Sequence, residues 1–244
     1  MRGIDVSPYQ HPAGASIDWQ AVAASGIAAV MVKLTEGSTW LNPYAAGDCA
    51  AAAAAGLQVG CYHFARPDLG NGADAEAAWF AVHLADLALD LPPALDSERP
   101  APGLRAWNEA WLERVPEAVG YGLEFDLPLD RLWVIRGGPE PADPGGAWGV
   151  QYGQGPVPGV AAICDLDVFR DPEEDPDMIV VNTYDAKTGA ATGAYVLVPQ
   201  TGGTAPFDPA KDSAPASAQR WTLSGDAYNA IVSAGRRPVP PASD

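Results

Sequence analysis

Short apolar runs alternate with helix-type patterns through the first hundred residues. The runs of strand length lie at residues 3–7, 27–37, 57–67 and 92–98, and the segments that separate them, at 17–26, 42–55 and 73–87, have helical apolar spacing or are rich in alanine. Asp18 is placed to cap the first of these helices and Gly26 to end it. Strands that alternate with helices predict a parallel sheet, either open or closed into a barrel.

The alternation weakens after residue 99. A helix is expected over 104–115, and strands are expected over 118–125, 131–138, 147–153 and 161–169. The last of these strands follow short connections rich in proline and glycine, with no clear helices between them. The second half of the barrel is therefore expected to depart from strict alternation.

The composition changes at Arg170, where an acidic, proline-interrupted linker is expected over 171–177. Residues 178–200 have the pattern of two strands around a glycine-containing turn, 201–220 read as loop, and a short helix is expected over 224–235 before a frayed tail. The predicted organisation is thus a barrel-sized domain over 1–170 and a small C-terminal α+β module over 178–244.

Charge and cysteine content narrow the classes of function. The 244 residues carry 14 Lys and Arg against 31 Asp and Glu, a formal charge of −17, with no basic patch, so nucleic acid and anionic membranes are not expected as partners. The sequence contains no run of 18 apolar residues, so a transmembrane helix is not expected. The three cysteines lack metal-type spacing and are expected to be buried and reduced. The first residues enter a strand pattern directly, which predicts synthesis in a cytoplasm without a signal peptide.

Polar residues recur where the predicted strands end, namely at Asp5, Glu36, His63, Asp96 and Glu98. The carboxyl ends of barrel strands form the catalytic face. Asp96 and Glu98 would point to the same side of a strand, with Cα atoms roughly 6.5 Å apart. Two acids at this spacing alone are more typical of a solvated strand end, and His63 alone is more typical of a satisfied core histidine. Acids at several strand ends together favour a site.

The motifs "GIDVSPYQ", "IDW", "VKLTEG", "GCYHFARP", "ALDSE" and "GVAAICDLDVF" occur in this order. In this respect the chain resembles glycoside hydrolase family 25, the Chalaropsis-type lysozymes common among phage endolysins, over residues 1 to about 170. The resemblance implies a flattened TIM-like (β/α)-barrel of the (β/α)5β3 type. It also implies an N-acetylmuramidase that cleaves the β-1,4 bond between N-acetylmuramic acid and N-acetylglucosamine in bacterial peptidoglycan, with no metal or cofactor.

The resemblance also implies roles for particular residues. Asp5, Asp96, Glu98 and Asp165 match the family's catalytic acids, and Glu36, Tyr62, Tyr121, Gln151 and Tyr152 match positions that line its substrate groove. Glu98 would act as general acid and then as general base, and Asp96 would orient the 2-acetamido group of the substrate. Asp5 and Asp165 would position water. Crowded carboxyls raise one another's pKa, which would keep one acid protonated near neutral pH.

Several alternatives stay open. The stretch from Glu98 to Asp165 is short for the family, and Val150 stands where a tryptophan is usual, so a catalytically impaired barrel that binds glycans or serves as a structural phage protein is one alternative. A polysaccharide deacetylase is another, although the three histidines supply no evident metal site. Asp165 and Asp167 share a strand face, and one of them could simply be exposed. The pair Trp107 and Trp111 is expected in the core, and Cys164 is expected to be packing.

The implied biology is that of an endolysin, made in the host cytoplasm and acting on the cell wall after membrane permeabilisation. The C-terminal module would then bind the wall or support self-association.

Overall fold

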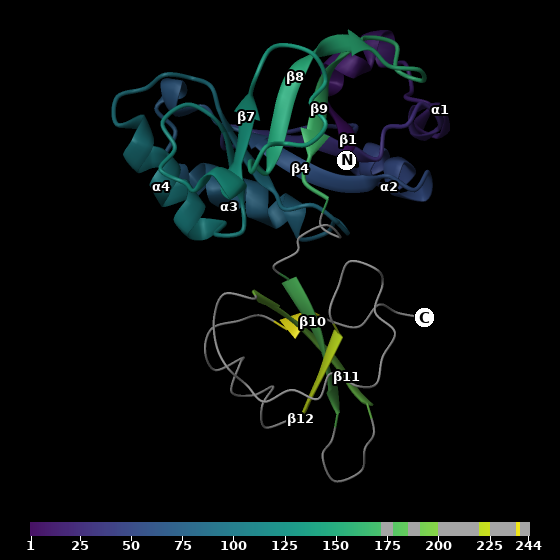
Figure 1. Cartoon of the computed structure of the whole chain (residues 1–244). Coiled ribbons are helices and arrows are strands. Elements are labelled where there is room, and N and C mark those ends of the chain that lie inside the picture. Colours follow the sequence, from purple (N-terminus) through teal and green to yellow (C-terminus); the bar gives the residue numbers. More distant parts are fainter. Residues whose placement is uncertain (172–177, 185–190, 200–219, 225–237, 240–244) are drawn as a thin grey trace. The chain divides into compact units, whose positions relative to one another are not determined.

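The structure is a computed structural model that describes residues 1–171, 178–184, 191–199, 220–224 and 238–239 (Figure 1). Two compact units divide the chain, Met1–Arg170 and Asp171–Asp244. In the second unit the strands β10 (Met178–Tyr184), β11 (Ala191–Pro199), β12 (Arg220–Ser224) and β13 (Pro238–Val239) form a sheet in the order β12-β10-β11-β13. The strand pair predicted over 178–200 is present. Strand β13 lies within the segment predicted to be a frayed tail. It pairs with Tyr195 and Val196 of β11. Three predicted segments lie outside the described residues: the linker over 172–177, the loop over 201–219 and the helix after Ser224.

The first unit is built on a barrel of eight strands. Its strands are β1 (Arg2–Val6), β2 (Ala29–Glu36), β4 (Gln58–Phe64), β5 (Ala94–Ser97), β6 (Val119–Gly122), β7 (Leu132–Ile135), β8 (Gly149–Pro156) and β9 (Ile163–Phe169), with β3 (Trp40–Leu41) added at the edge of β2. The order is β1-β9-β8-β7-β6-β5-β4-β2, and parallel pairing of β1 with β2 closes the barrel. Strand β9 runs antiparallel to both of its neighbours. The mixed barrel confirms the predicted fold class.

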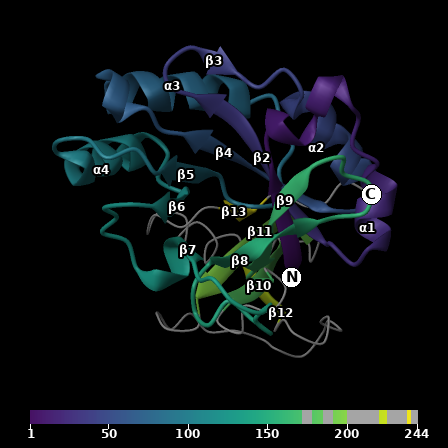
Figure 2. The ribbon, with the colours of Figure 1, turned by 90° about the horizontal axis from the view of Figure 1, so that it is seen from above.

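Four α-helices follow the early strands on the outside of the barrel: α1 (Trp19–Ala24), α2 (Ala45–Ala54), α3 (Ala73–Leu84) and α4 (Leu104–Arg114). The Asp18 carboxylate caps α1 by accepting a hydrogen bond from the Ala21 N–H at 3.1 Å, as predicted. The crossover from β6 to β7 contains only the 3₁₀ helix η4 (Leu129–Arg131). The described residues between β7 and β9 contain no helix, and Figure 2 shows loops joining these strands. The predicted departure from strict alternation is therefore confirmed.

Alternation along the strands produces two apolar layers. One cluster lies between the strands and the helices and includes Ile4, Val22, Val30 and Phe80. A second cluster includes Met31, Tyr62, Tyr121, Trp133 and Phe169. Successive strand residues point to opposite faces, so β1 gives Ile4 to the first cluster, while Gly3 contacts Phe169 of the second. A Cβ at Gly3 would lie 2.3 Å from the Phe169 ring, which explains the glycine there.

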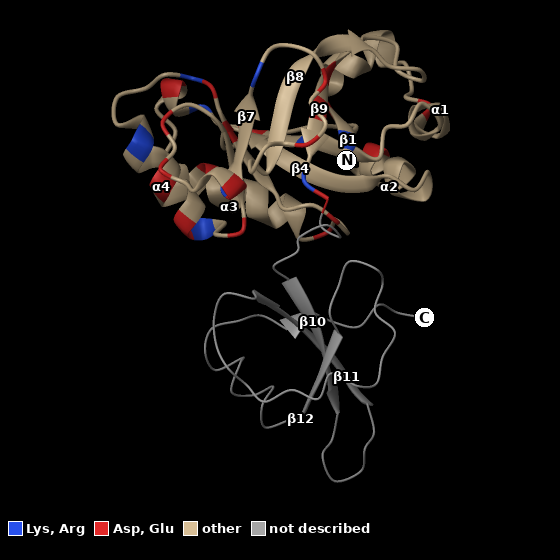
Figure 3. Ribbon diagram, in the orientation of Figure 1, with Lys and Arg blue, Asp and Glu red and all other residues tan. Residues whose placement is uncertain are grey.

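Several residues predicted to be structural are buried. His63 and Trp111 are completely buried and stack at 5.6 Å, while Trp107 is half-buried and donates a hydrogen bond from Nε1 to the Asn71 carbonyl oxygen at 2.8 Å. Cys49, Cys61 and Cys164 are buried and unbridged. In the described part of the chain, no helix has both the length and the apolar character needed to cross a bilayer. Figure 3 shows basic residues scattered singly among the acidic ones in the first unit.

Candidate active site

A groove of about 470 Å³ lies at the carboxyl ends of the parallel barrel strands. It is lined by Asp5, Ser7, Lys33, Tyr62, Phe64, Asp96, Glu98, Tyr121, Trp133, Ile135, Gln151, Gln154 and Asp165. All four acids predicted to be catalytic are in this set, together with three of the five residues predicted to contact substrate. Within the described residues, no three His, Cys, Asp or Glu side chains are placed to hold a metal ion.

Pairing of β1 with β9 places two of the acids side by side. Asp5 and Asp165 are direct partners in this antiparallel ladder, 160 positions apart in the chain. Glutamine side chains from β8 reach both acids: Gln151 Nε2 donates to Asp5 Oδ2 at 3.3 Å, and Gln154 Nε2 donates to Asp165 Oδ1 at 2.8 Å. Tyr121 in turn donates to Gln151 Oε1 at 2.8 Å. These hydrogen bonds link side chains from β6, β8, β1 and β9 along the groove.

The other two acids lie at the end of β5 and differ in their environment. Asp96 is 6% exposed, and its Oδ1 atom has no hydrogen-bond partner among the described residues, whereas Glu98 is exposed. Strand β6 approaches this turn closely, because a Cβ at Gly122 would lie 2.4 Å from the Ser97 carbonyl oxygen. Gly122 also has a φ of +102°, a backbone conformation that residues with a side chain rarely adopt. The glycine therefore allows β6 to approach the Ser97 carbonyl next to Glu98.

The crowding of carboxyls raises pKa values, as expected. Burial, followed by the charge of Asp165, raises the pKa of Asp5 to about 8. Burial, followed by the charges of Glu98 and Asp5, raises the pKa of Asp96 well above its usual range. Desolvation disfavours the charged form of a carboxyl, and neighbouring negative charges add to the effect. The raised pKa of Asp5 therefore keeps this carboxyl largely protonated at neutral pH.

Asp167 is a further acid of this region that the sequence did not assign to the site. It is completely buried, its Oδ1 atom accepts a hydrogen bond from Trp133 Nε1 at 2.9 Å, and its Oδ2 atom has no partner among the described residues. Burial, followed by the charge of Asp5, raises its pKa well above the usual range. Its position two residues after Asp165 on one strand face was the available signal. Neither aspartate is simply exposed, because Asp165 is partly buried in the groove wall.

Two residues expected in the groove lie elsewhere. Tyr152 packs on the outer face of β8 with Val150 and Val168, and its hydroxyl donates to Glu140 Oε2 at 3.1 Å. Tyr152 follows Gln151 directly on β8, so its side chain points to the face opposite that of Gln151, which lines the groove. The bulge between Gln151 and Gly153 allows Gln154, three residues after Gln151, to line the groove as well. Glu36 does not line the groove either. It pairs with Lys33, which does, and with Arg66.

Asp5→Asn is expected to stabilise the protein increasingly as the pH rises from about 4 to about 8. The folded chain keeps the Asp5 proton up to pH about 8, while the unfolded chain loses it near the ordinary value of 3.8, so wild-type stability falls across this window. Asparagine stays neutral in both states. Thermal unfolding should give a Tm gain over wild type of about 5 °C at pH 8 that vanishes near pH 4. The exposed Asp86→Asn should show no such trend, and a gain independent of pH would contradict the prediction.

The first half of the chain matches a known family. Residues 4–123 match the model described as glycosyl hydrolases family 25. Lysozyme M1 of Streptomyces globisporus is 35% identical over 111 residues, which are 44% of this chain and 36% of that protein, so the chain spans about a third of this relative.

Two solved structures resemble the chain in three dimensions. The lysozyme of Streptomyces coelicolor is 27% identical, with a TM-score of 0.58 over 70% of this chain and 92% of that one. The CTP1L endolysin has a TM-score of 0.59 over 75% of this chain and 72% of that one, and at 22% identity this likeness bears on the fold alone. The family match, the barrel and the acids gathered in its groove agree, and the first unit, Met1–Arg170, belongs to glycoside hydrolase family 25.

Proposed function

We propose that the protein is a lysozyme that hydrolyses peptidoglycan at the β-1,4 bond between N-acetylmuramic acid and N-acetylglucosamine. The observation that carries the proposal is the meeting of Asp5, Asp96, Glu98 and Asp165 in one groove. Glycoside hydrolysis needs a proton donor at the leaving oxygen and a negative group near the developing positive charge of the sugar ring. A protein that only bound glycans would have no need for four converging carboxyls, one of which stays exposed.

The surroundings of the acids support a division of roles. Glu98 is the exposed member of the β5 pair, so it can reach a glycosidic oxygen as general acid and later take the proton of the attacking water as general base. The Asp96 Oδ1 atom, which has no hydrogen-bond partner among the described residues, would accept the N–H of the substrate's 2-acetamido group and orient the oxygen of that group as the nucleophile. Asp5 and Asp165 face each other across the β1–β9 ladder and would position the water.

The identity of the cleaved bond can be measured directly. Purified peptidoglycan digested with the protein should yield muropeptides with reducing N-acetylmuramic acid ends, identified by mass spectrometry after borohydride reduction. Reducing N-acetylglucosamine ends would mean that a different bond is cleaved. Retained pull-down on peptidoglycan without any cleavage would favour a glycan-binding protein.

A finer proposal concerns the biological role. We infer an endolysin, made in the host cytoplasm and acting on the wall after membrane permeabilisation, on the basis of the motifs that the chain shares with phage endolysins. The second unit would then direct the barrel to the wall. A chain truncated at Pro172 is expected to digest purified peptidoglycan at the full rate and to lyse permeabilised cells at least about tenfold more slowly. A change in oligomeric state alone, measured by light scattering, would instead assign self-association to this unit.

A further inference from the structure

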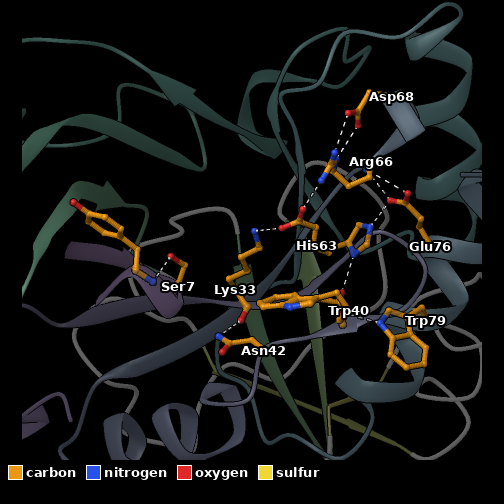
Figure 4. Close-up of polar contacts among 12 residues, drawn as sticks. Ser7, Lys33, Trp40, Asn42, His63, Arg66, Asp68, Glu76 and Trp79 are labelled. Atoms are coloured by element: carbon orange, nitrogen blue, oxygen red, sulfur yellow. Dashed lines mark hydrogen bonds and ion pairs between the residues drawn. The ribbon is translucent and has the colours of Figure 1, made fainter. Parts of the chain in front are cut away.

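A chain of ion pairs begins at Lys33, which lines the groove, and ends at Asp68 (Figure 4). Lys33 Nζ lies 2.7 Å from Glu36 Oε2, and Arg66 lies 2.7 Å from Glu36 Oε1. Arg66 also pairs with Asp68 at 2.9 Å. Glu36 thus lies between two cations, and although burial raises its pKa, the hydrogen bonds from Lys33 and Arg66 leave that pKa below its usual value. The Glu36 carboxylate is therefore charged and held at both oxygens.

A bulge in β2 makes the contact between Lys33 and Glu36 possible. Residues three apart on a regular strand point to opposite faces. Here the pairing of β2 with β4 shifts between Lys33 and Thr35, so one extra residue, Leu34, is accommodated. Thr35 then faces His63, and Glu36 returns to the side of Lys33. The local backbone is built to join these two side chains.

The Arg66 end of the chain is anchored in the core. The Arg66 backbone N–H donates to both carboxylate oxygens of Glu76, at 3.0 and 3.2 Å. Glu76 is completely buried and accepts from His63 Nε2 at 2.8 Å, and His63 Nδ1 lies 2.7 Å from Thr35 Oγ1. The backbone that carries the Arg66 guanidinium is thus fixed, and Glu36 is held by a rigid support.

The Lys33 end enters the groove. Lys33 Nζ lies 4.2 Å from the centroid of the Phe64 ring and 5.5 Å from that of Trp40, which are cation–π distances, and its side chain is 13% exposed. Phe64 is the ladder partner of Asp96 on the neighbouring strand β5. Lys33 is also the one cation among the described residues that line the groove.

We infer that Glu36 is a positioning residue: supported by Arg66, it holds the Lys33 ammonium over Phe64 so that the groove's cation faces Asp96. Its bearing on catalysis rests on the proposed lysozyme function. Glu36 was expected to contact the substrate, and in this inference it acts through Lys33 instead. The ionisable groups that face Asp96 are Asp5 on β1, Lys33 on β2, Tyr62 on β4, Glu98 after β5 and Tyr121 on β6. Lys33 is the cation in this set, and its charge lowers the pKa of Asp96 against burial and the neighbouring acids.

The test measures the pKa of the Asp96 side chain by carbon NMR of its carboxyl in the full chain. Lys33→Met removes the charge and should raise this pKa by about one unit. Glu36→Gln should raise it by about half a unit, because Lys33 is released from the Phe64 ring. If Lys33 stayed in place without Glu36, loss of a negative charge would instead lower the Asp96 pKa or leave it unchanged, and the inference would be overturned.

Three further variants make the readout specific. In the Lys33→Met background, Glu36→Gln should cause no additional rise, because Glu36 acts through Lys33. Arg66→Gln should raise the Asp96 pKa in the same direction as Glu36→Gln, which provides a second route if Glu36→Gln does not fold. The matched control is Asp68→Asn, which removes the other partner of Arg66 and should leave the Asp96 pKa unchanged. A rise in Asp68→Asn equal to that in Glu36→Gln would contradict the inference.

Activity separates this inference from the proposed function. The limb of the kcat/KM profile that follows Asp96 should move to higher pH in Glu36→Gln, by the same amount as the NMR value. If the wild type hydrolyses no peptidoglycan while the Asp96 pKa shifts as described, the proposed function fails and the positioning role stands. If the wild type is active and Glu36→Gln shifts neither the pKa nor the profile, the positioning role fails and the function stands.

Discussion

Glu98→Gln is expected to reduce the rate of peptidoglycan hydrolysis by about a thousand-fold, because the glutamine amide cannot donate a proton to the leaving oxygen. Glu98 is the exposed carboxyl at the end of β5, and the substitution keeps the size of its side chain. The fold should therefore be retained. The measurement is the rate of release of reducing ends from purified peptidoglycan, with the products identified by mass spectrometry.

Two comparisons make the result specific to acid catalysis. Glu113→Gln removes an exposed carboxylate from α4, outside the groove, and should leave the rate unchanged. An aryl glycoside substrate whose leaving group needs no proton should recover a large part of the lost rate in Glu98→Gln. Equal losses on both substrates would assign Glu98 to binding or structure, and a loss below about tenfold would remove it from the proton transfer.

Glu76→Ala is expected to lower the free energy of unfolding by about 4 kcal/mol and the Tm by about 12 °C. Glu76 and His63 are both completely buried, and the Arg66 N–H shares the same carboxylate. Burial lowers the pKa of His63, so the neutral ring donates from Nε2 to Glu76 and accepts from Thr35 at Nδ1. Removal of the carboxylate leaves the buried His63 N–H and the partly buried Arg66 N–H without their acceptor, which is the costly part of the change.

Denaturant unfolding of the variants tests this prediction. Glu76→Gln keeps one acceptor oxygen and should cost less than Glu76→Ala. Asp74→Ala, on the same helix α3, breaks an exposed pair with Arg114 whose side chains are 70% and 62% exposed, and should cost less than about 1 kcal/mol. Equal losses in Glu76→Ala and Asp74→Ala would show that the buried network contributes nothing beyond a surface pair.

The alternation of strands and helices up to α4 could be predicted because it depends on local pattern: apolar runs, the Asp18 cap and glycine stops. The acids at the strand ends could be predicted for the same reason, since parallel strands bring their carboxyl ends to one edge. The family resemblance assigned Asp5 and Asp165 to one site, but their direct pairing forms only because β9 inserts antiparallel between β1 and β8. No local pattern specifies that insertion.

The residues at the carboxyl ends of the early strands could be read from the sequence, because an apolar run and the polar residues that follow it are local features. Which of these side chains face the groove depends on the folded barrel, because the bulges in β2 and β8 interrupt the two-residue alternation and form only when distant strands pair. The bulge in β2 turns Glu36 toward Lys33, and the bulge in β8 lets Gln151 and Gln154, three residues apart, both line the groove. Closure of the barrel also buries Asp167 and partly buries Asp5, and this burial is the main reason that Asp5 keeps its proton.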